Sequence, residues 1–178
     1  MQRFKTAIFG ALIIFIFGIC NFACQKNYRD CQRCDCSDVK AATGNGTVDS
    51  LLIFVPNIFT PNGDGTNDAF RPSYNADFIA TAKLEIFSVN KKELLFQTQE
   101  IYGTWKGKDS KGNELGERIF AWKFSGLTKW NKPFSLEGEV YLHRGTCYDK
   151  KEPAKCRFPD QIDPKLGFIY PTSEKSCD

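Results

Sequence analysis

Short apolar runs separated by polar turns recur along the chain, and this spacing predicts β-strands. Leu84 and Ile86 alternate with Lys83 and Glu85, as the residues of a strand with one buried face do. No stretch keeps a helical period. Because short strands follow one another without helices between them, the pattern predicts an all-β fold, an antiparallel β-sandwich. The predicted strands cover residues 51–55, 82–89, 93–98, 118–124 and 135–143, with a hairpin turn at 90–92.

The segment before the strands has the layout of an export signal. Two basic residues precede an apolar run over residues 7–19, which is short for a membrane span of about 20 residues. A small residue then stands directly before Cys24. This arrangement resembles a bacterial lipoprotein signal, which implies cleavage before Cys24 and a covalent lipid on it. The alternative is an ordinary secretory signal or short anchor, with Cys24 in a disulfide.

The cysteines form two groups at the two ends of the chain. There are eight, of which Cys20 leaves with the signal and Cys24 carries the lipid. An exported chain enters an oxidising compartment, so we expect disulfides, with at least one bridge joining the two groups. Sequence alone does not choose among the connectivities, and a metal site at the first group is the alternative. The groups are Cys31, Cys34 and Cys36, and Cys147, Cys156 and Cys177.

The regions around the strands are polar and irregular. Residues 41–50 are small and polar and are interpreted as a linker. Residues 146–178 contain four prolines and few apolar runs, so they cannot form a core of their own. We expect this tail to pack as irregular chain on the sandwich. The expected organisation is a signal peptide at 1–23, a Cys-rich tether and linker at 24–50, the β-sandwich at 51–145 and the tail at 146–178.

Four segments of the middle region carry a family resemblance. They resemble, in order, the parts of the gliding-motility-associated C-terminal domain, also called the type B sorting domain of type IX secretion. The resemblance covers about residues 52–144 and implies an immunoglobulin-like sandwich from Gram-negative bacteria that use this secretion system. The segments are FVPNIFTPNGDGTNDAFRP (54–72), LEIFSVNKKELLFQT (84–98), TWKGKDSKGNELGERIFAWKF (104–124) and LEGEVYLHR (136–144).

The chain also departs from the family in its length on either side of the domain. Family members that act as export signals end shortly after the last strand, whereas this chain continues from Arg144 to Asp178 and has little sequence ahead of the domain. We therefore expect that the domain is reused as a stand-alone lipoprotein module.

The first of these segments contains a candidate cation loop. Asn62, Asp64, Asn67 and Asp68 gather oxygen ligands of the kind that Ca²⁺ takes. The EF-hand pattern is not met, because Asn67 and Ser73 stand where it needs glycine and glutamate. The favoured interpretation is structural, with glycines at positive φ and Asn and Asp side chains bonded to nearby backbone. Calcium is the weaker alternative, and no other cofactor is expected.

The remaining polar and aromatic residues do not assemble an enzyme site. The single histidine, His143, excludes sites with two imidazoles, and it has no obvious nucleophile or carboxylate partner. Trp122 alternates with aromatic neighbours, so it and Trp105 are expected in the core rather than as sugar platforms. The acids and bases of the Gly-rich segment are interpreted as a solvated loop, so we expect no enzyme. They are Asp109, Lys111, Glu114 and Glu117.

The charge balance and the anchor together shape the functional hypothesis. Lys and Arg number 24 against 21 for Asp and Glu, which disfavours a nucleic-acid binder. We expect a lipid-anchored outer-membrane protein, facing the cell surface or else the periplasm. The expected role is a non-enzymatic accessory subunit of a complex for protein insertion, secretion or uptake, with β-barrels and other lipoproteins as partners and no small-molecule substrate. The alternatives are a type IX secretion substrate carrying a type B sorting domain, and a glycan-binding adhesin.

Overall fold

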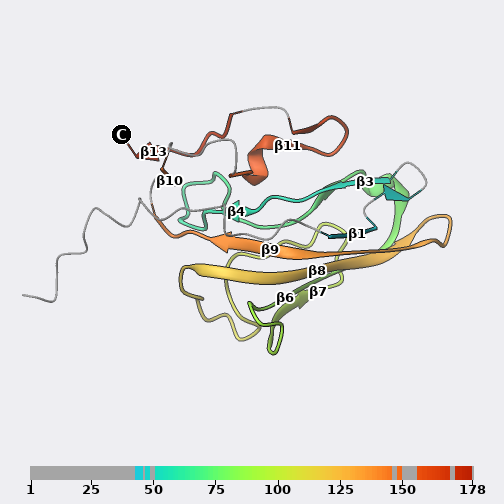
Figure 1. Cartoon of the computed structure of the whole chain (residues 1–178), viewed down its shortest axis with the longest axis horizontal. Coiled ribbons are helices and arrows are strands. Elements are labelled where there is room, and N and C mark those ends of the chain that lie inside the picture. Colours follow the sequence, from blue (N-terminus) through green and yellow to red (C-terminus); the bar gives the residue numbers. More distant parts are fainter. Residues whose placement is uncertain are drawn as a thin grey trace, which may run out of the picture. The chain divides into compact units, whose positions relative to one another are not determined.

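The longest strands form where apolar and polar residues alternate most regularly, and they build one large antiparallel sheet. The structure, a computed structural model, describes residues 43–45, 47–48, 51–145, 148–149, 156–168 and 171–177. β8 is central and pairs with β6 on one side and β9 on the other, while β7 pairs with β6 as the predicted hairpin (Figure 1). These strands are β6 (Ile79–Ser88), β7 (Leu94–Thr98), β8 (Arg118–Thr128) and β9 (Pro133–Leu142).

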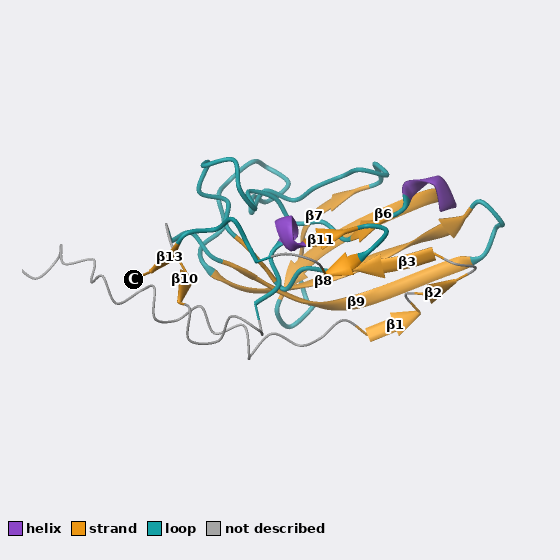
Figure 2. Ribbon diagram, turned by 90° about the horizontal axis from the view of Figure 1, so that it is seen from above, coloured by secondary structure: helices purple, strands orange, loops and turns teal. Residues whose placement is uncertain are grey.

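Two short strands share the outer edge of β9. β1 (Thr43–Asn45) pairs antiparallel with the first half of β9, and β4 (Ile58–Phe59) pairs parallel with its end. Figure 2 shows β1 running alongside β9. The interpretation of residues 41–50 as a linker is therefore wrong for Thr43–Asn45, which forms this edge strand. Backbone hydrogen bonding needs no apolar side chains, so a polar edge strand has no alternation to reveal it.

A second, smaller sheet faces the first. It consists of β2 (Thr47–Val48), β3 (Leu51–Phe54) and β5 (Ser73–Tyr74), paired in that order. A short 3₁₀ helix, η3 (Ala76–Phe78), follows β5 and leads into β6. Of these elements only β3 matches a predicted strand, because two-residue strands are too short to show a period.

Both sheets contribute to a single hydrophobic core. Leu51 of β3 and Trp122 of β8 are almost completely buried, and Tyr74 of β5 stacks on Phe124 of β8 with ring centroids 5.1 Å apart. Trp105 is also buried, and its indole Nε1 donates to the carbonyl oxygen of Lys108 at 2.8 Å. The all-β sandwich is thus confirmed, and both tryptophans lie in its core as expected.

The described part of the tail packs on the sandwich. Phe158 and Cys156 bury their side chains against Ile58 of β4, and a Cβ added at Gly167 would stand 3.1 Å from the ring of Phe54. Cys156 is disulfide-bonded. The tail is less irregular than expected, since it contains two short strand pairs and one 3₁₀ helix. These are β10 (Tyr148–Asp149) with β13 (Ser176–Cys177), β11 (Ile162–Asp163) with β12 (Gly167–Phe168), and η4 (Pro159–Gln161).

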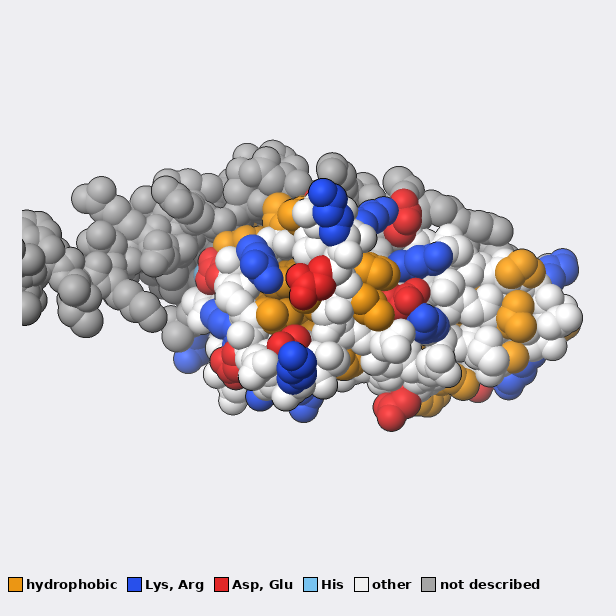
Figure 3. Space-filling model, turned by 90° about the horizontal axis from the view of Figure 1, so that it is seen from below, with side chains coloured by type: hydrophobic (Ala, Val, Ile, Leu, Met, Phe, Trp, Pro, Cys, Tyr) orange, Lys and Arg blue, Asp and Glu red, His pale blue; other side chains and the backbone are white. Residues whose placement is uncertain are grey.

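The surface mixes charges of both signs. On the face shown in Figure 3, basic and acidic side chains are interspersed and the apolar patches between them are small. Among the described residues, no helix has the length and apolar character that crossing a membrane requires.

Candidate functional site

The loop from 61 to 68 is held by its own side chains. The carboxylate of Asp68 accepts from the backbone N–H groups of Gly63 at 2.7 Å and Gly65 at 2.8 Å. Asn62 Oδ1 accepts from Asp64 N–H, and Asp64 Oδ1 accepts from Thr66 N–H. Both glycines have positive φ, +85° and +88°, as the structural interpretation predicted. The loop is therefore rigid although residues 63–65 are exposed.

The third residue of the candidate cation loop, Asn67, faces the tail instead. Asn67, at φ +51°, is 7% exposed, and its side-chain oxygen accepts from the N–H of Asp160 at 2.8 Å. Its amide nitrogen donates to Glu174 Oε2 at 3.1 Å and Thr172 Oγ1 at 3.3 Å. Asn67 thus joins the loop to the tail. That the loop binds no calcium stays a prediction, with calcium as the weaker alternative.

Glu174 completes this junction from the tail side. Its Oε2 accepts from Thr60 Oγ1 at 2.5 Å, and the side chain is 6% exposed. Its other oxygen, Oε1, has no hydrogen-bond partner among the described residues. Burial raises the pKa of Glu174, the hydrogen bonds from Thr60 and Asn67 oppose this, and the negative charges of Asp64 and Asp160 add to it. The junction is therefore acidic, and its central carboxyl group is easier to protonate than usual.

A second cluster closes the end of β9. The guanidinium of Arg144 donates to the carbonyl oxygens of Leu115 at 2.8 Å and Gly107 at 2.9 Å, which fastens the connection between β7 and β8 to the end of β9 at two points. Glu117 Oε1 accepts from the hydroxyl of Tyr141 at 2.6 Å and lies 3.1 Å from Nδ1 of the buried His143. Glu117 is exposed, as expected for the loop before β8. The expectation that His143 lacks a carboxylate partner is wrong, because the two residues meet only when β9 folds against this loop.

The electrostatics of this cluster favour an ionised Glu117. Burial alone would raise the pKa of Glu117, but hydrogen bonds from His143 and Tyr141 and from the N–H of Arg144 lower it to about 2. Among the other residues of the segment, Lys111 and Glu114 are exposed, as expected. The cluster is a structural clamp that holds the loop before β8 against the end of β9.

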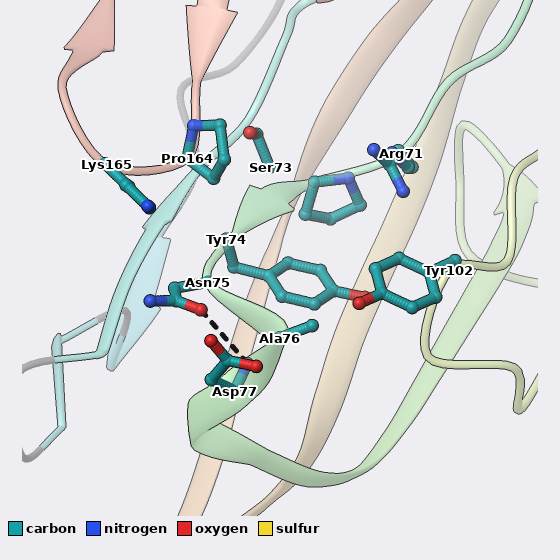
Figure 4. Close-up of a pocket in the computed structure, with 10 residues that line it drawn as sticks. Arg71, Ser73, Tyr74, Asn75, Ala76, Asp77, Tyr102, Pro164 and Lys165 are labelled. Carbon is teal, nitrogen blue, oxygen red and sulfur yellow. Dashed lines mark hydrogen bonds between the residues drawn. The ribbon is translucent and has the colours of Figure 1, made fainter.

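A pocket of about 230 Å³ lies where three distant segments meet (Figure 4). Residues 71–77, around β5 and η3, form one wall, and Tyr102 adds an exposed aromatic ring. Pro164 and Lys165, from the turn between β11 and β12, form the third side. Sequence reasoning missed this pocket because nothing in any one segment indicates the other two.

Most predicted cysteine sites lie outside the described residues. These include Cys24, the three cysteines of the first group and Cys147. Cys177 lies in β13, and only its backbone is described. The lipid on Cys24 and the disulfide connectivity therefore stay predictions.

The comparisons with known proteins identify the middle of the chain. Residues 53–136 match the model of the CHU_C type IX secretion signal domain. The chain carries a domain of this family. The CHU_C match runs from β3 to the first half of β9, and it supports the resemblance to the type B sorting domain. A comparison with curated proteins gives no match.

The CHU_C domain indicates a secreted or cell-surface protein. A type IX secretion signal also favours the hypothesis of a secretion substrate over that of an accessory subunit of a membrane complex. The matched range contains the rigid loop and most of the core, whereas β1, the end of β9 and the tail lie outside it. In this protein the CHU_C domain is thus extended at both ends by segments that pack on it.

Proposed function

We propose that this protein is a substrate of type IX secretion, exported to the cell surface or beyond through its CHU_C domain. The match of residues 53–136 to the secretion signal family is the observation that carries the proposal. The rigid loop supports it, because residues 63–65 are exposed and held by the Asp68 carboxylate. A preorganised, exposed loop loses little conformational entropy on binding, so it suits recognition by the export machinery.

The test compares the location of the full chain in two strains. One is a bacterium with type IX secretion, and the other is an isogenic strain that lacks the translocon of that system. We expect the chain, detected by antibody, in the medium or protease-accessible on intact cells of the parent, and retained in the periplasm of the mutant. An unchanged membrane location in both strains would overturn the proposal and favour the accessory subunit.

Lipid attachment is a separate proposal about the same protein. It rests on the apolar run at 7–19 and the small residue before Cys24. Mass spectrometry of the mature N-terminus decides it, with an acylated Cys24 expected. An N-terminus elsewhere, or an unmodified Cys24, would show that the protein is not anchored in this way.

A further inference from the structure

The floor of the pocket beside β5 is aromatic, and one of its two rings is held by the core. Tyr74 stacks on Phe124 of the core, and its hydroxyl donates to the carbonyl oxygen of Ile101. The neighbouring ring of Tyr102 is 67% exposed, and the guanidinium of Arg71 lies 5.9 Å from its centroid. Exposing an aromatic ring beside a polar pocket leaves apolar area that a flat ligand can cover. Figure 4 shows both tyrosines along the base of the pocket.

The polar groups around this floor are of two kinds. Arg71 and Lys165 bring positive charge from different segments, and neither forms an ion pair with a described residue. Asp77 offers a carboxylate on another side of the pocket, next to Asn75, whose side-chain oxygen accepts from the N–H of Asp77 at 3.0 Å. The pocket therefore combines cations for an anionic group with acceptors for hydroxyl groups.

The size of the pocket restricts the ligand. Pockets for drug-sized molecules measure roughly 300–1,000 Å³, and this one, at about 230 Å³, suits one ring-sized group. Because it is open to solvent along the exposed ring of Tyr102, a longer chain can extend beyond it.

We propose that this pocket binds an acidic saccharide, with one uronic acid unit inside it. The sugar ring covers Tyr102, its carboxylate pairs with Arg71, and its hydroxyl groups bond to Asp77 and to Lys165 on the other sides of the pocket. Arg71 suits this role because a guanidinium can hold a carboxylate with two parallel hydrogen bonds. The tail completes the site by supplying Lys165. The inference concerns this surface alone and does not depend on the route of export.

The test is an NMR titration of the full chain with methyl β-glucuronide, and methyl β-glucoside as the neutral probe. We expect shifts centred on Arg71, Tyr102 and Lys165, and at least tenfold weaker binding of the glucoside. Acetate, which carries the charge without the ring, should also bind at least tenfold more weakly than the glucuronide. Arg71→Gln and Tyr102→Ala should each weaken glucuronide binding about tenfold, whereas Tyr102→Phe should keep it.

The control variant is Arg157→Gln, which removes an exposed arginine of the tail outside the pocket and should leave the affinity unchanged. Folding of each variant is checked by its melting temperature. Equal binding of the two sugars, binding of acetate as tight as that of the glucuronide, no binding of the glucuronide, or binding insensitive to Arg71→Gln in a folded protein would each overturn the proposal.

Discussion

Glu174 makes the attachment of the tail depend on pH. Because its pKa is raised in the folded protein, folding favours the protonated form, so its contribution to stability is full below the unfolded pKa and falls as pH rises through the folded value. We expect Glu174→Gln, which is neutral at every pH, to stabilise the protein at pH 7 and to lose this advantage towards pH 4. Denaturant unfolding of the variant and the wild type between pH 4 and pH 7 measures this difference in stability. A difference that does not vary with pH would contradict this assignment.

Glu117 should behave in the opposite way. Its folded pKa of about 2 lies below the ordinary value, so its contribution is present above about pH 4.5 and is lost as pH falls towards 2. Glu117→Gln should therefore destabilise the protein at pH 7, with the difference from the wild type shrinking in acid. The matched control is Glu114→Gln, because the Glu114 side chain is 63% exposed and its ion pairs are weak. If both variants unfold alike, the clamp at the end of β9 contributes nothing measurable.

The turns of the rigid loop depend on glycine because of backbone conformation rather than space. Gly63 has φ +85°, and no atom lies within 4 Å of the place where a Cβ would stand, so Gly63→Ala is strained by its φ alone. We expect Gly63→Ala to lower the free energy of unfolding by about 1–2 kcal/mol. Gly116 also has open space but no positive φ, so Gly116→Ala should be nearly neutral. Urea unfolding of the two variants tests the comparison, and equal effects would show that the loop relaxes.

The tail is attached as an element through Phe158. This ring is 1% exposed and packs with Cys156 against Ile58. Phe158→Ala should lower the free energy of unfolding by about 3–5 kcal/mol if the tail stays in place, and by less if the tail detaches instead. Limited proteolysis distinguishes the two, since a detached tail is cut first while the sandwich stays intact. Arg157→Ala, which changes an exposed neighbour, should leave the cleavage pattern unaltered.

Sequence patterns predicted the elements that bury a regular face and missed those that do not. The strands at 82–89 and 118–124 are present because Leu84, Ile86 and Trp122 alternate into the core, although β6 and β8 extend beyond the predicted bounds. The contacts of Glu174 with Thr60 join residues 114 positions apart, and no local pattern indicates such a pair. The loop glycines were predicted because positive φ is a local property of the chain.

At the scale of the whole molecule, the cysteines decide how the ends of the chain are joined. Cys156 is buried and disulfide-bonded, beside the strand β4 that pairs with the end of β9. We expect at least one bridge between the group Cys31, Cys34 and Cys36 and the cysteines of the tail. Non-reducing peptide mapping of the mature protein tests this. Bridges confined to each group, or thiols that hold stoichiometric zinc, would contradict it.

The parallel pairing of β4 with the end of β9 also determines when in the course of synthesis the fold can be completed. Ile58 and Phe59 find their partners, Tyr141 and Leu142, only after nearly the whole domain has left the ribosome or a membrane channel. Thr60 and Asn67 must wait longer still, for Glu174 of the tail. Contacts so distant in sequence form slowly, because the loop between them must close first. A chain built in this way completes its fold only when its last residues are available.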